Sequence, residues 1–233
     1  MADRSRVIVV ASPHPRNDAL EEHTRAALPG HRVVRIRRKE DLTFKALQEL
    51  RPEYVFLAHW SWMLPADVYT NFECVVFHMS DVPYGRGGSP LQNLIVRGHT
   101  ETVISALRCE KDVDAGPVYL KRPLSLEGTA EEILRRASDV VEAMMLEIVR
   151  TRPEPQPQSG DVVLFKRRRP QDGSLSALGN LSTIYDYIRM LDADGYPPAF
   201  LETEQLRLEF TGARLTGDSV VANVRIRKKD NDG

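Results

Sequence analysis

The chain has 233 residues, of which 42% are hydrophobic and 28% charged, with a formal net charge of −1. This length allows one large domain, or one domain of ordinary size with a small second one. The nearly neutral balance excludes a global field that would attract nucleic acid or an anionic membrane. Two cysteines are too few for a disulfide framework, and the first apolar run is too short for a signal peptide or a membrane span. We therefore expect a soluble, cytoplasmic protein.

Residues 1–109 alternate between strand-like and helix-like segments. Short β-branched or apolar runs predict strands, and segments of helical composition bounded by Pro, Gly or a capping residue predict helices. Strands are expected at 6–12, 31–36, 53–59, 74–78 and 102–109, and helices at 17–28, 41–50 (capped by Asp41), 65–72 and 89–98.

A long amphipathic helix is the clearest expectation. Thr129 and Glu132 have capping-box spacing, and apolar residues then recur every three or four positions as far as Ile148. Strands that alternate with helices in this way predict an α/β fold, with an open, mostly parallel Rossmann-like sheet and helices on both faces.

The composition changes after residue 150. We expect a catalytic domain at 1–150, a Pro-rich connector at 151–165, and a small C-terminal unit at 166–233 with one helix and a hairpin or short sheet. Residues 151–233 hold twelve Lys and Arg and twelve Asp and Glu, so the basic run at 166–169 indicates a solvated face rather than a nucleic-acid site. The small unit could cover an acceptor, or its hairpin edge could pair with a second copy in a homodimer.

His78 ends a predicted strand, and Asp114 follows the next one. Ligands of open α/β sheets bind outside the carboxyl ends of the strands, so neighbouring strands would bring these side chains to one crevice. A carboxylate beside an imidazole fixes its tautomer, which suits acid–base chemistry. The alternatives are a purely structural pair, or two residues that never meet.

Two further segments have double interpretations. The glycines around Arg86 allow a ligand to approach the backbone, and Arg86 could hold a phosphate, although a turn with a solvated arginine explains the pattern equally well. Trp60 and Trp62 would share a face in an extended chain and could line a slot for a flat heterocycle. Core packing is the more common use of such residues.

The combination of HMSDVPYGRGGSPLQNLI, DVDAGPVYLK and LEGTAEEI resembles the folate-dependent formyltransferase family. In that family a strand ends in Asn-x-His-Pro-Ser, a loop of the Leu-Pro-x-x-Arg-Gly type follows, and an Asp-x-Gly comes after the next strand. The match covers roughly residues 54–150. The segments HWSW, GRGGSPLQN and YDYIRMLDADGYPPAF are most similar to the branch that acts on nucleotide-linked amino sugars, including enzymes of the pseudaminic-acid type.

The resemblance implies an N-formyltransferase with 10-formyltetrahydrofolate as donor, no metal, and a nucleotide-sugar rather than a nucleic acid or membrane as partner. His78 would assist proton transfer from the attacking amine, and Asp114 would orient His78. The remaining implied roles are binding of the donor by Trp60, Ser61, Trp62, Met63, Leu64 and Asp112, and binding of the acceptor by Ser80, Tyr84, Arg86, Gly87 and Asn93.

One position departs from the family pattern. The family asparagine two residues before the histidine corresponds to Val76, and the following proline to Met79. Valine cannot donate a hydrogen bond to a developing oxyanion, and the loss of one such donor typically costs about 100- to 1000-fold in rate. We expect Asn93 or Ser80 to replace it, or slower or different chemistry.

The sequence is therefore compatible with three main functions. The first is formyl transfer to the amine of a nucleotide-linked 4-amino-4,6-dideoxy sugar. The second is formyl transfer to another amine, such as methionyl-tRNA or a hydroxylated ornithine; the neutral C-terminal unit weakens the tRNA option. The third is a folate- or nucleotide-binding protein without activity, for which Val76 is the main argument, and a metal-free hydrolase that releases formate is a weaker fourth.

Overall fold

The computed structural model describes residues 6–229, which form two compact units. The first unit contains the described residues up to Gly87 together with Val103–Leu124 and Arg135–Leu164. The second contains Gly88–Thr102, Ser125–Leu134 and the described residues from Phe165 on. The division interleaves segments from distant parts of the chain, and the predicted boundaries at residues 150 and 165 stay a prediction.

The main sheet has six strands in the order β2-β1-β3-β4-β6-β7. Strands β1 to β4 run parallel to their neighbours, whereas β6 runs antiparallel to β4. This confirms the predicted open, mostly parallel α/β sheet. Its strands are β1 (Arg6–Ala11), β2 (His31–Ile36), β3 (Pro52–Leu57), β4 (Cys74–His78), β6 (Glu101–Arg108) and β7 (Val118–Ser125).

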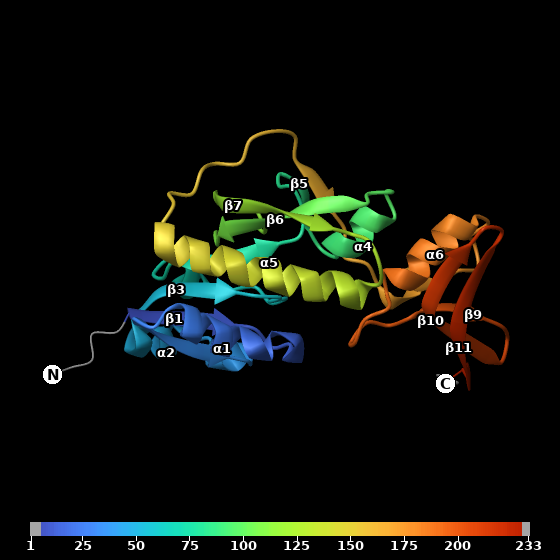
Figure 1. The fold of residues 1–233 in the computed structure, drawn as a ribbon, viewed down its shortest axis with the longest axis horizontal. Coiled ribbons are helices and arrows are strands. Elements are labelled where there is room, and N and C mark those ends of the chain that lie inside the picture. Colours follow the sequence, from blue (N-terminus) through green and yellow to red (C-terminus); the bar gives the residue numbers. More distant parts are fainter. Residues whose placement is uncertain (1–5, 230–233) are drawn as a thin grey trace. The chain divides into compact units, whose positions relative to one another are not determined.

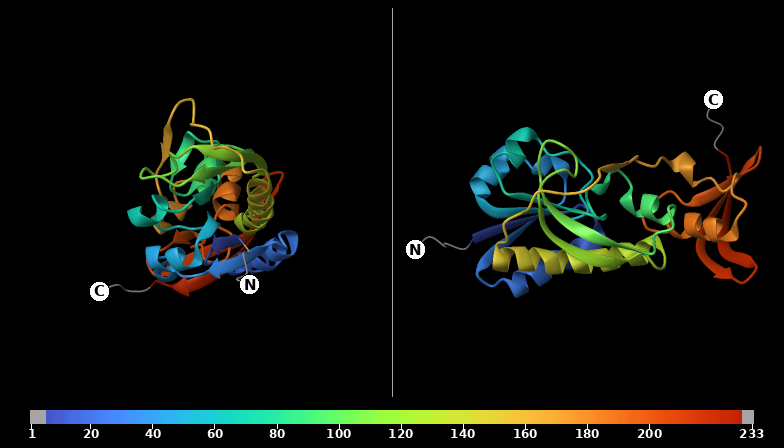
Figure 2. Two further views of the ribbon diagram at one scale, coloured as in Figure 1. Left: turned by 90° about the vertical axis from the view of Figure 1, so that its left-hand side faces the viewer. Right: turned by 90° about the horizontal axis from the view of Figure 1, so that it is seen from above.

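Helices of the first unit cover both faces of this sheet (Figure 1). Leu47 of α2 (Phe44–Leu50) and Val68 of α3 (Ala66–Tyr69) belong to the core cluster on one face. Helices α1 (Asp18–Ala27) and α5 (Ala130–Thr151) lie side by side, joined by a contact of 3.1 Å between His23 and Glu142 (Figure 2). Strands buried between two helical layers read as continuous apolar runs, which is why the sequence indicates them clearly.

Two helix starts compare differently with the sequence. The capping box of α5 is confirmed, because the Thr129 amide donates to Glu132 Oε2 at 2.8 Å and the Glu132 amide to Thr129 Oγ1 at 3.3 Å. The expected Asp41 cap is wrong. Thr43 caps α2 by accepting from the Ala46 amide at 3.2 Å, while Asp41 lies in the short 3₁₀ turn Lys39–Asp41 and pairs with Arg38.

The Gly-rich segment after β4 forms a short strand instead of an open loop. Strand β5 (Tyr84–Gly87) pairs with β8 (Val163–Phe165) in a separate two-stranded sheet. Figure 1 shows the connector after α5, in gold, running from the end of that helix back toward β5. The connector therefore lies beside the segment that follows His78.

The second unit contains α4 (Pro90–Ile95), a 3₁₀ turn (Pro170–Gly173), α6 (Leu181–Arg189) and a three-stranded sheet in the order β11-β10-β9. The expected hairpin is β10 (Leu206–Thr216) with β11 (Ser219–Lys228), and β9 (Ala199–Glu202) was not expected.

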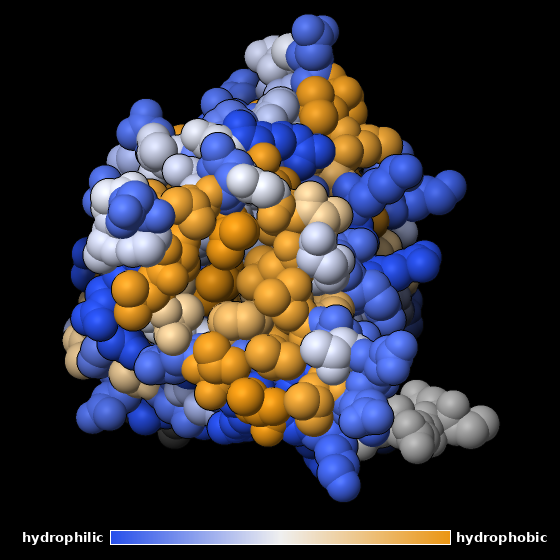
Figure 3. All heavy atoms as spheres, turned by 90° about the vertical axis from the view of Figure 1, so that its right-hand side faces the viewer, coloured by the Kyte–Doolittle hydropathy of each residue, from blue (hydrophilic) through white to orange (hydrophobic). Residues whose placement is uncertain are grey.

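One face of that three-stranded sheet is apolar but only partly covered. Phe210, Val220 and Ala222 pack in the cluster that contains Ile188 of α6, whereas Val224 and Ile226 are 47% and 62% exposed. Figure 3 shows apolar side chains gathered on this part of the second unit.

No helix within residues 6–229 has the length and apolar character needed to cross a bilayer.

Candidate active site

His78 is the last residue of β4 and is 7% exposed. Because side chains alternate along a strand, Cys74, Val76 and His78 share one face. The Nε2 atom of His78 lies 2.7 Å from the carbonyl oxygen of Gly85, and Nδ1 lies 3.3 Å from Oδ2 of Asp114. The Gly85 carbonyl and the Asp114 carboxylate both accept, so either ring nitrogen donates to its partner when it carries the hydrogen.

Asp114 reaches His78 by a route that differs from the expected one. The sequence predicts both residues at the carboxyl ends of neighbouring strands. Strands β4 and β6 are indeed neighbours, but they are antiparallel, and Arg108 at the end of β6 lies opposite Val75 rather than His78. The loop 109–117 then brings Asp114 back to the imidazole. The two side chains meet because of this loop and not because of parallel strand ends.

The carboxylate of Asp114 is held by backbone as well as by His78. Asp114 has a positive φ of 53°, a conformation that is uncommon for residues other than glycine, and its side chain is 10% exposed. Its Oδ2 accepts a hydrogen bond from the Gly87 amide at 2.9 Å. The Gly-rich segment therefore positions the carboxylate that faces the histidine.

Gly85 and Gly87 adopt φ values of 79° and 103°, which a side chain would disfavour. These conformations let the segment fold back over β4. The carbonyl of Gly85 faces His78 Nε2 and accepts from Ser80 Oγ at 3.2 Å. The Ser80 carbonyl in turn accepts from Ser105 Oγ at 2.7 Å. The sequence left the need for glycine here ambiguous, and the fold explains it by this close approach of backbone to an imidazole.

Val76 leaves the site without the family's amide. Its side chain is partly buried and packs against the core cluster on the face that carries His78. The amide of Asn93 donates to the carbonyls of Gly88 (2.9 Å), Ser89 (3.1 Å) and Lys166 (2.9 Å). Ser80 donates to Gly85, as described above. Both expected replacements for the missing donor are thus engaged in hydrogen bonds of their own.

A second group of predicted residues lines a cavity of about 280 Å³ at the end of β3. Trp60 and Trp62 meet edge to face with ring centroids 4.9 Å apart. The Nε1 atom of Trp60 is buried and has no hydrogen-bond partner among the described residues. The lining consists of Lys39, Glu40, Leu42, Trp60, Trp62, Met63, Leu64 and Pro65. An apolar slot beside aromatic side chains fits a flat heterocycle.

The other predicted residues lie elsewhere. Ser61 and Asp112 are exposed and do not line this cavity, and Tyr84 is partly buried in β5. Arg86 sends Nε and one terminal nitrogen to Oε1 of Gln158, at 3.0 and 2.8 Å. In residues 6–229, no three His, Cys, Asp or Glu side chains come together as a metal site.

A polar cluster that the sequence did not indicate lies after β1 and β3. Asn17 Nδ2 donates to Ser12 Oγ at 2.8 Å and lies 3.0 Å from Nδ1 of His59, which has a positive φ of 54°. Burial lowers the pKa of His59 to about 4, so this ring is neutral at pH 7. The sequence suggests for His59 only the end of a strand, because its partners are 42 residues and more away.

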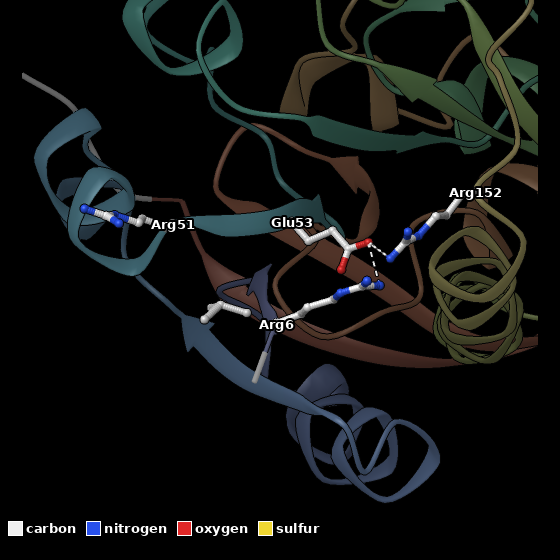
Figure 4. Close-up of a pocket in the computed structure, with 5 residues that line it drawn as sticks. Arg6, Arg51, Glu53 and Arg152 are labelled. Carbon is white, nitrogen blue, oxygen red and sulfur yellow. Dashed lines mark ion pairs between the residues drawn. The ribbon is translucent and has the colours of Figure 1, made fainter. Parts of the chain in front are cut away.

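A larger cavity, of about 360 Å³, opens at the opposite ends of β1 and β3 (Figure 4). Oε1 of Glu53 forms ion pairs there with a guanidinium nitrogen of Arg152 at 2.5 Å and of Arg6 at 3.8 Å. The side chain of Arg51 points away from them. Figure 4 shows the Glu53 carboxylate paired with two guanidinium groups. Nε2 of His31 lies 3.6 Å from the other oxygen of this carboxylate, Oε2. Glu53 is therefore shared among three nitrogen-bearing side chains at this edge of the sheet.

Comparisons with known proteins identify the family of this chain. A model of the formyl transferase family matches residues 4–149, and a model of the C-terminal domain of methionyl-tRNA formyltransferase matches residues 170–227. Methionyl-tRNA formyltransferase of Thermodesulfovibrio yellowstonii is 23% identical over 178 residues, which are 73% of this chain and 58% of that protein. The chain thus spans less than two thirds of the length of this curated relative.

Solved structures resemble this chain over a larger share of its length than that curated relative does. Methionyl-tRNA formyltransferase from Clostridium thermocellum is 42% identical with a TM-score of 0.93, covering 96% of this chain and 100% of that one. A sugar N-formyltransferase from Shewanella is 14% identical with a TM-score of 0.68, covering 86% and 94%, which shows the fold alone. The match of the family model to most of the chain, together with the 42% identical structure, shows that this chain belongs to the formyl transferase family.

Proposed function

We propose that this chain is an N-formyltransferase that moves the formyl group of 10-formyltetrahydrofolate to an amine. The observation that carries the proposal is the buried pair of His78 Nδ1 and Asp114 Oδ2, 3.3 Å apart, in a chain of the formyl transferase family. Buried titratable pairs of this kind are typical of catalytic sites.

The roles of the two residues follow from chemistry. As the amine nitrogen bonds to the formyl carbon it becomes positively charged and must lose a proton, and the departing nitrogen of the donor must gain one. An imidazole can take the first proton and return it for the second, while a fixed carboxylate keeps the ring oriented. To act as this base, the ring must donate its hydrogen from Nδ1 to Asp114 and leave Nε2 unprotonated. Nε2 lies 2.7 Å from the Gly85 carbonyl in this structure, so this contact must open before Nε2 can take a proton from the amine.

The slot at Trp60 is the proposed place for the donor's pterin. It is the apolar cavity described above, and Trp60 Nε1 has no partner among the described residues. The donor supplies the activated formyl carbon; the chain supplies its orientation.

Methionyl-tRNA is the first candidate acceptor. The name methionyl-tRNA formyltransferase belongs to the 42% identical structure and to the curated relative. A tRNA acceptor reverses the expectation that the chain has no nucleic-acid partner, and it replaces the nucleotide-sugar as the leading candidate.

A nucleotide-linked amino sugar remains the second candidate because of charge. Residues 151–233 have equal numbers of basic and acidic residues, whereas tRNA binding draws on a positive surface. A compact acceptor with two phosphates needs far fewer cationic contacts than a tRNA. Sugars of the 4-amino-4,6-dideoxy or pseudaminic-acid type belong to this candidate.

The test is a formylation assay with both acceptors in parallel. Purified protein is incubated with 10-formyltetrahydrofolate and either methionyl-tRNA or a set of nucleotide-linked amino sugars, and products are weighed by mass spectrometry. We expect a mass increment of one carbonyl group on the methionyl-tRNA that is absent with His78→Ala. An increment on a sugar alone would replace the first candidate by the second. Binding of folate without product in either arm would support the inactive binding protein that Val76 suggests.

A further inference from the structure

Gln158 lies in the Pro-rich connector and contacts both segments that surround His78. Its Oε1 accepts two hydrogen bonds from the guanidinium of Arg86 in β5. Its Nε2 donates to the carbonyl oxygens of Asp114 and Gly116, each at 2.8 Å. One side chain thus makes four hydrogen bonds, to the strand that covers the imidazole and to the loop that carries the carboxylate.

The orientation of this amide is fixed by its partners. A guanidinium can only donate and a backbone carbonyl can only accept, so Oε1 must face Arg86 and Nε2 must face the loop. Both amide hydrogens and the amide oxygen are used. No residue other than glutamine or asparagine can satisfy both sides without changing charge, and asparagine is one methylene shorter.

The loop that Gln158 holds is under unusual constraint. Asp114 has a positive φ, and a Cβ placed on Gly116 would come within 1.9 Å of the Arg108 carbonyl oxygen. The positive φ of Asp114 costs free energy and persists only when the surrounding structure holds it. Hydrogen bonds to the carbonyls of Asp114 and Gly116 supply part of that hold. On its other side, Asp114 Oδ2 accepts from Gly87, the residue after Arg86.

We propose that Gln158 is a positioning residue for formyl transfer, which acts by fixing the Asp114 carboxylate against His78. The proposal rests on the proposed function for its activity readout. It also assigns Arg86 to the same network, as a partner of Gln158, rather than to binding of a phosphate on the acceptor.

Gln158→Met is the main test, because methionine is unbranched and neutral and lacks all four hydrogen bonds. A displacement of catalytic groups by about 1 Å can cost on the order of 100-fold in rate. We expect kcat to fall by about 10- to 100-fold with KM for the donor and the acceptor unchanged. Gln156→Met is the matched control, since Gln156 lies in the same connector and its side chain bonds, within residues 6–229, only to the Glu154 carbonyl.

A second measurement separates positioning from a general loss of structure. In an Asp114→Asn background, Gln158→Met should have no further effect on kcat, because the residue that it positions is already disabled. A full additional loss would overturn the proposal. If Gln158→Met does not fold, Arg86→Ala replaces it: a fall in kcat of about tenfold at constant acceptor KM supports the network, whereas a raised acceptor KM assigns Arg86 to the acceptor.

A third readout does not depend on turnover. The imidazole ¹⁵N signals of His78, assigned with His78→Gln and recorded at a fixed pH, should change in Gln158→Met and stay constant in Gln156→Met. Unchanged His78 signals would overturn the positioning role even in a protein without formyl transfer. Changed signals in a protein that forms no product would contradict the proposed function alone.

Discussion

The two ends of the main sheet's parallel strands both carry charged side chains, but they use them differently. At the first residues of β1 and β3, which Figure 4 shows, Glu53 pairs with Arg6 and Arg152. The side chains of these two arginines are 56% and 47% exposed. At the end of β4, the side chains of His78 and Asp114 are only 8% and 10% exposed, and their other partners are backbone groups of Gly85 and Gly87.

This difference in exposure favours His78 and Asp114 over the residues of the larger cavity as the candidate site. Exposed ion pairs are screened by water and contribute little, and their long side chains have no fixed geometry. A buried imidazole–carboxylate pair that backbone hydrogen bonds hold in place keeps its geometry, which acid–base catalysis requires. The four predictions below test this contrast, from the largest expected effect to the smallest.

Removing either member of the buried pair should have the largest effect. We expect His78→Ala and Asp114→Asn each to lower kcat by on the order of 1000-fold, because proton transfer loses its base or the orientation of that base. The measurement is steady-state formylation with the better of the two acceptors. His23→Ala, an exposed histidine that pairs with Glu142, is the control. Near-normal rates in both variants would contradict the catalytic assignment.

Restoring the family's amide at Val76 should have the next largest effect. We expect Val76→Asn to raise kcat on the order of 100-fold, because the amide would lie one pleat before His78 on the same face and could donate to a developing oxyanion. Val76→Leu is the control of similar shape without a donor. Equal rates in the two variants would show that the missing amide does not limit the rate of formylation.

The neutral His59 should make stability depend on pH. Its folded pKa of about 4 lies below the unfolded value of about 6.5, so the unfolded chain binds the proton more readily. The stability is therefore complete above about pH 6.5 and is lost as pH falls toward 4, by about 2 kcal/mol at pH 5.

Urea unfolding at pH 7.5 and pH 5 measures this effect. His59→Asn keeps a residue that tolerates positive φ but removes the titrating ring, so its free energy of unfolding should depend less on pH than that of the wild type, by about 2 kcal/mol. The same pH dependence in both proteins would show that another group is responsible.

The arginine cluster should give the smallest effect. Arg152→Ala removes an ion pair between an arginine that is 47% exposed and Glu53, so we expect a loss of at most about 1 kcal/mol in the free energy of unfolding and no change in kcat. Chemical unfolding and the formylation assay measure the two quantities. A large fall in kcat would place function at this edge and remove the contrast between the two ends.

Local patterns in the sequence determined most of the secondary structure. The apolar runs of β1 and β4, the periodicity of α5 and its capping box all depend on residues within a few positions of one another. The motifs around His78 and Asp114 also indicated the family. Interactions of this short range are encoded directly in the order of residues, which is why they can be predicted.

Tertiary structure decided how those residues are used. The antiparallel direction of β6, the return of Asp114 to His78, and the contact between Arg86 and Gln158 across 72 positions leave no local pattern. The cavity at Trp60 likewise needs Lys39, Glu40 and Leu42 from a separate segment. Such contacts depend on which segments the whole chain brings together, so the sequence by itself identified the catalytic candidates, while only the fold decided what holds them in place.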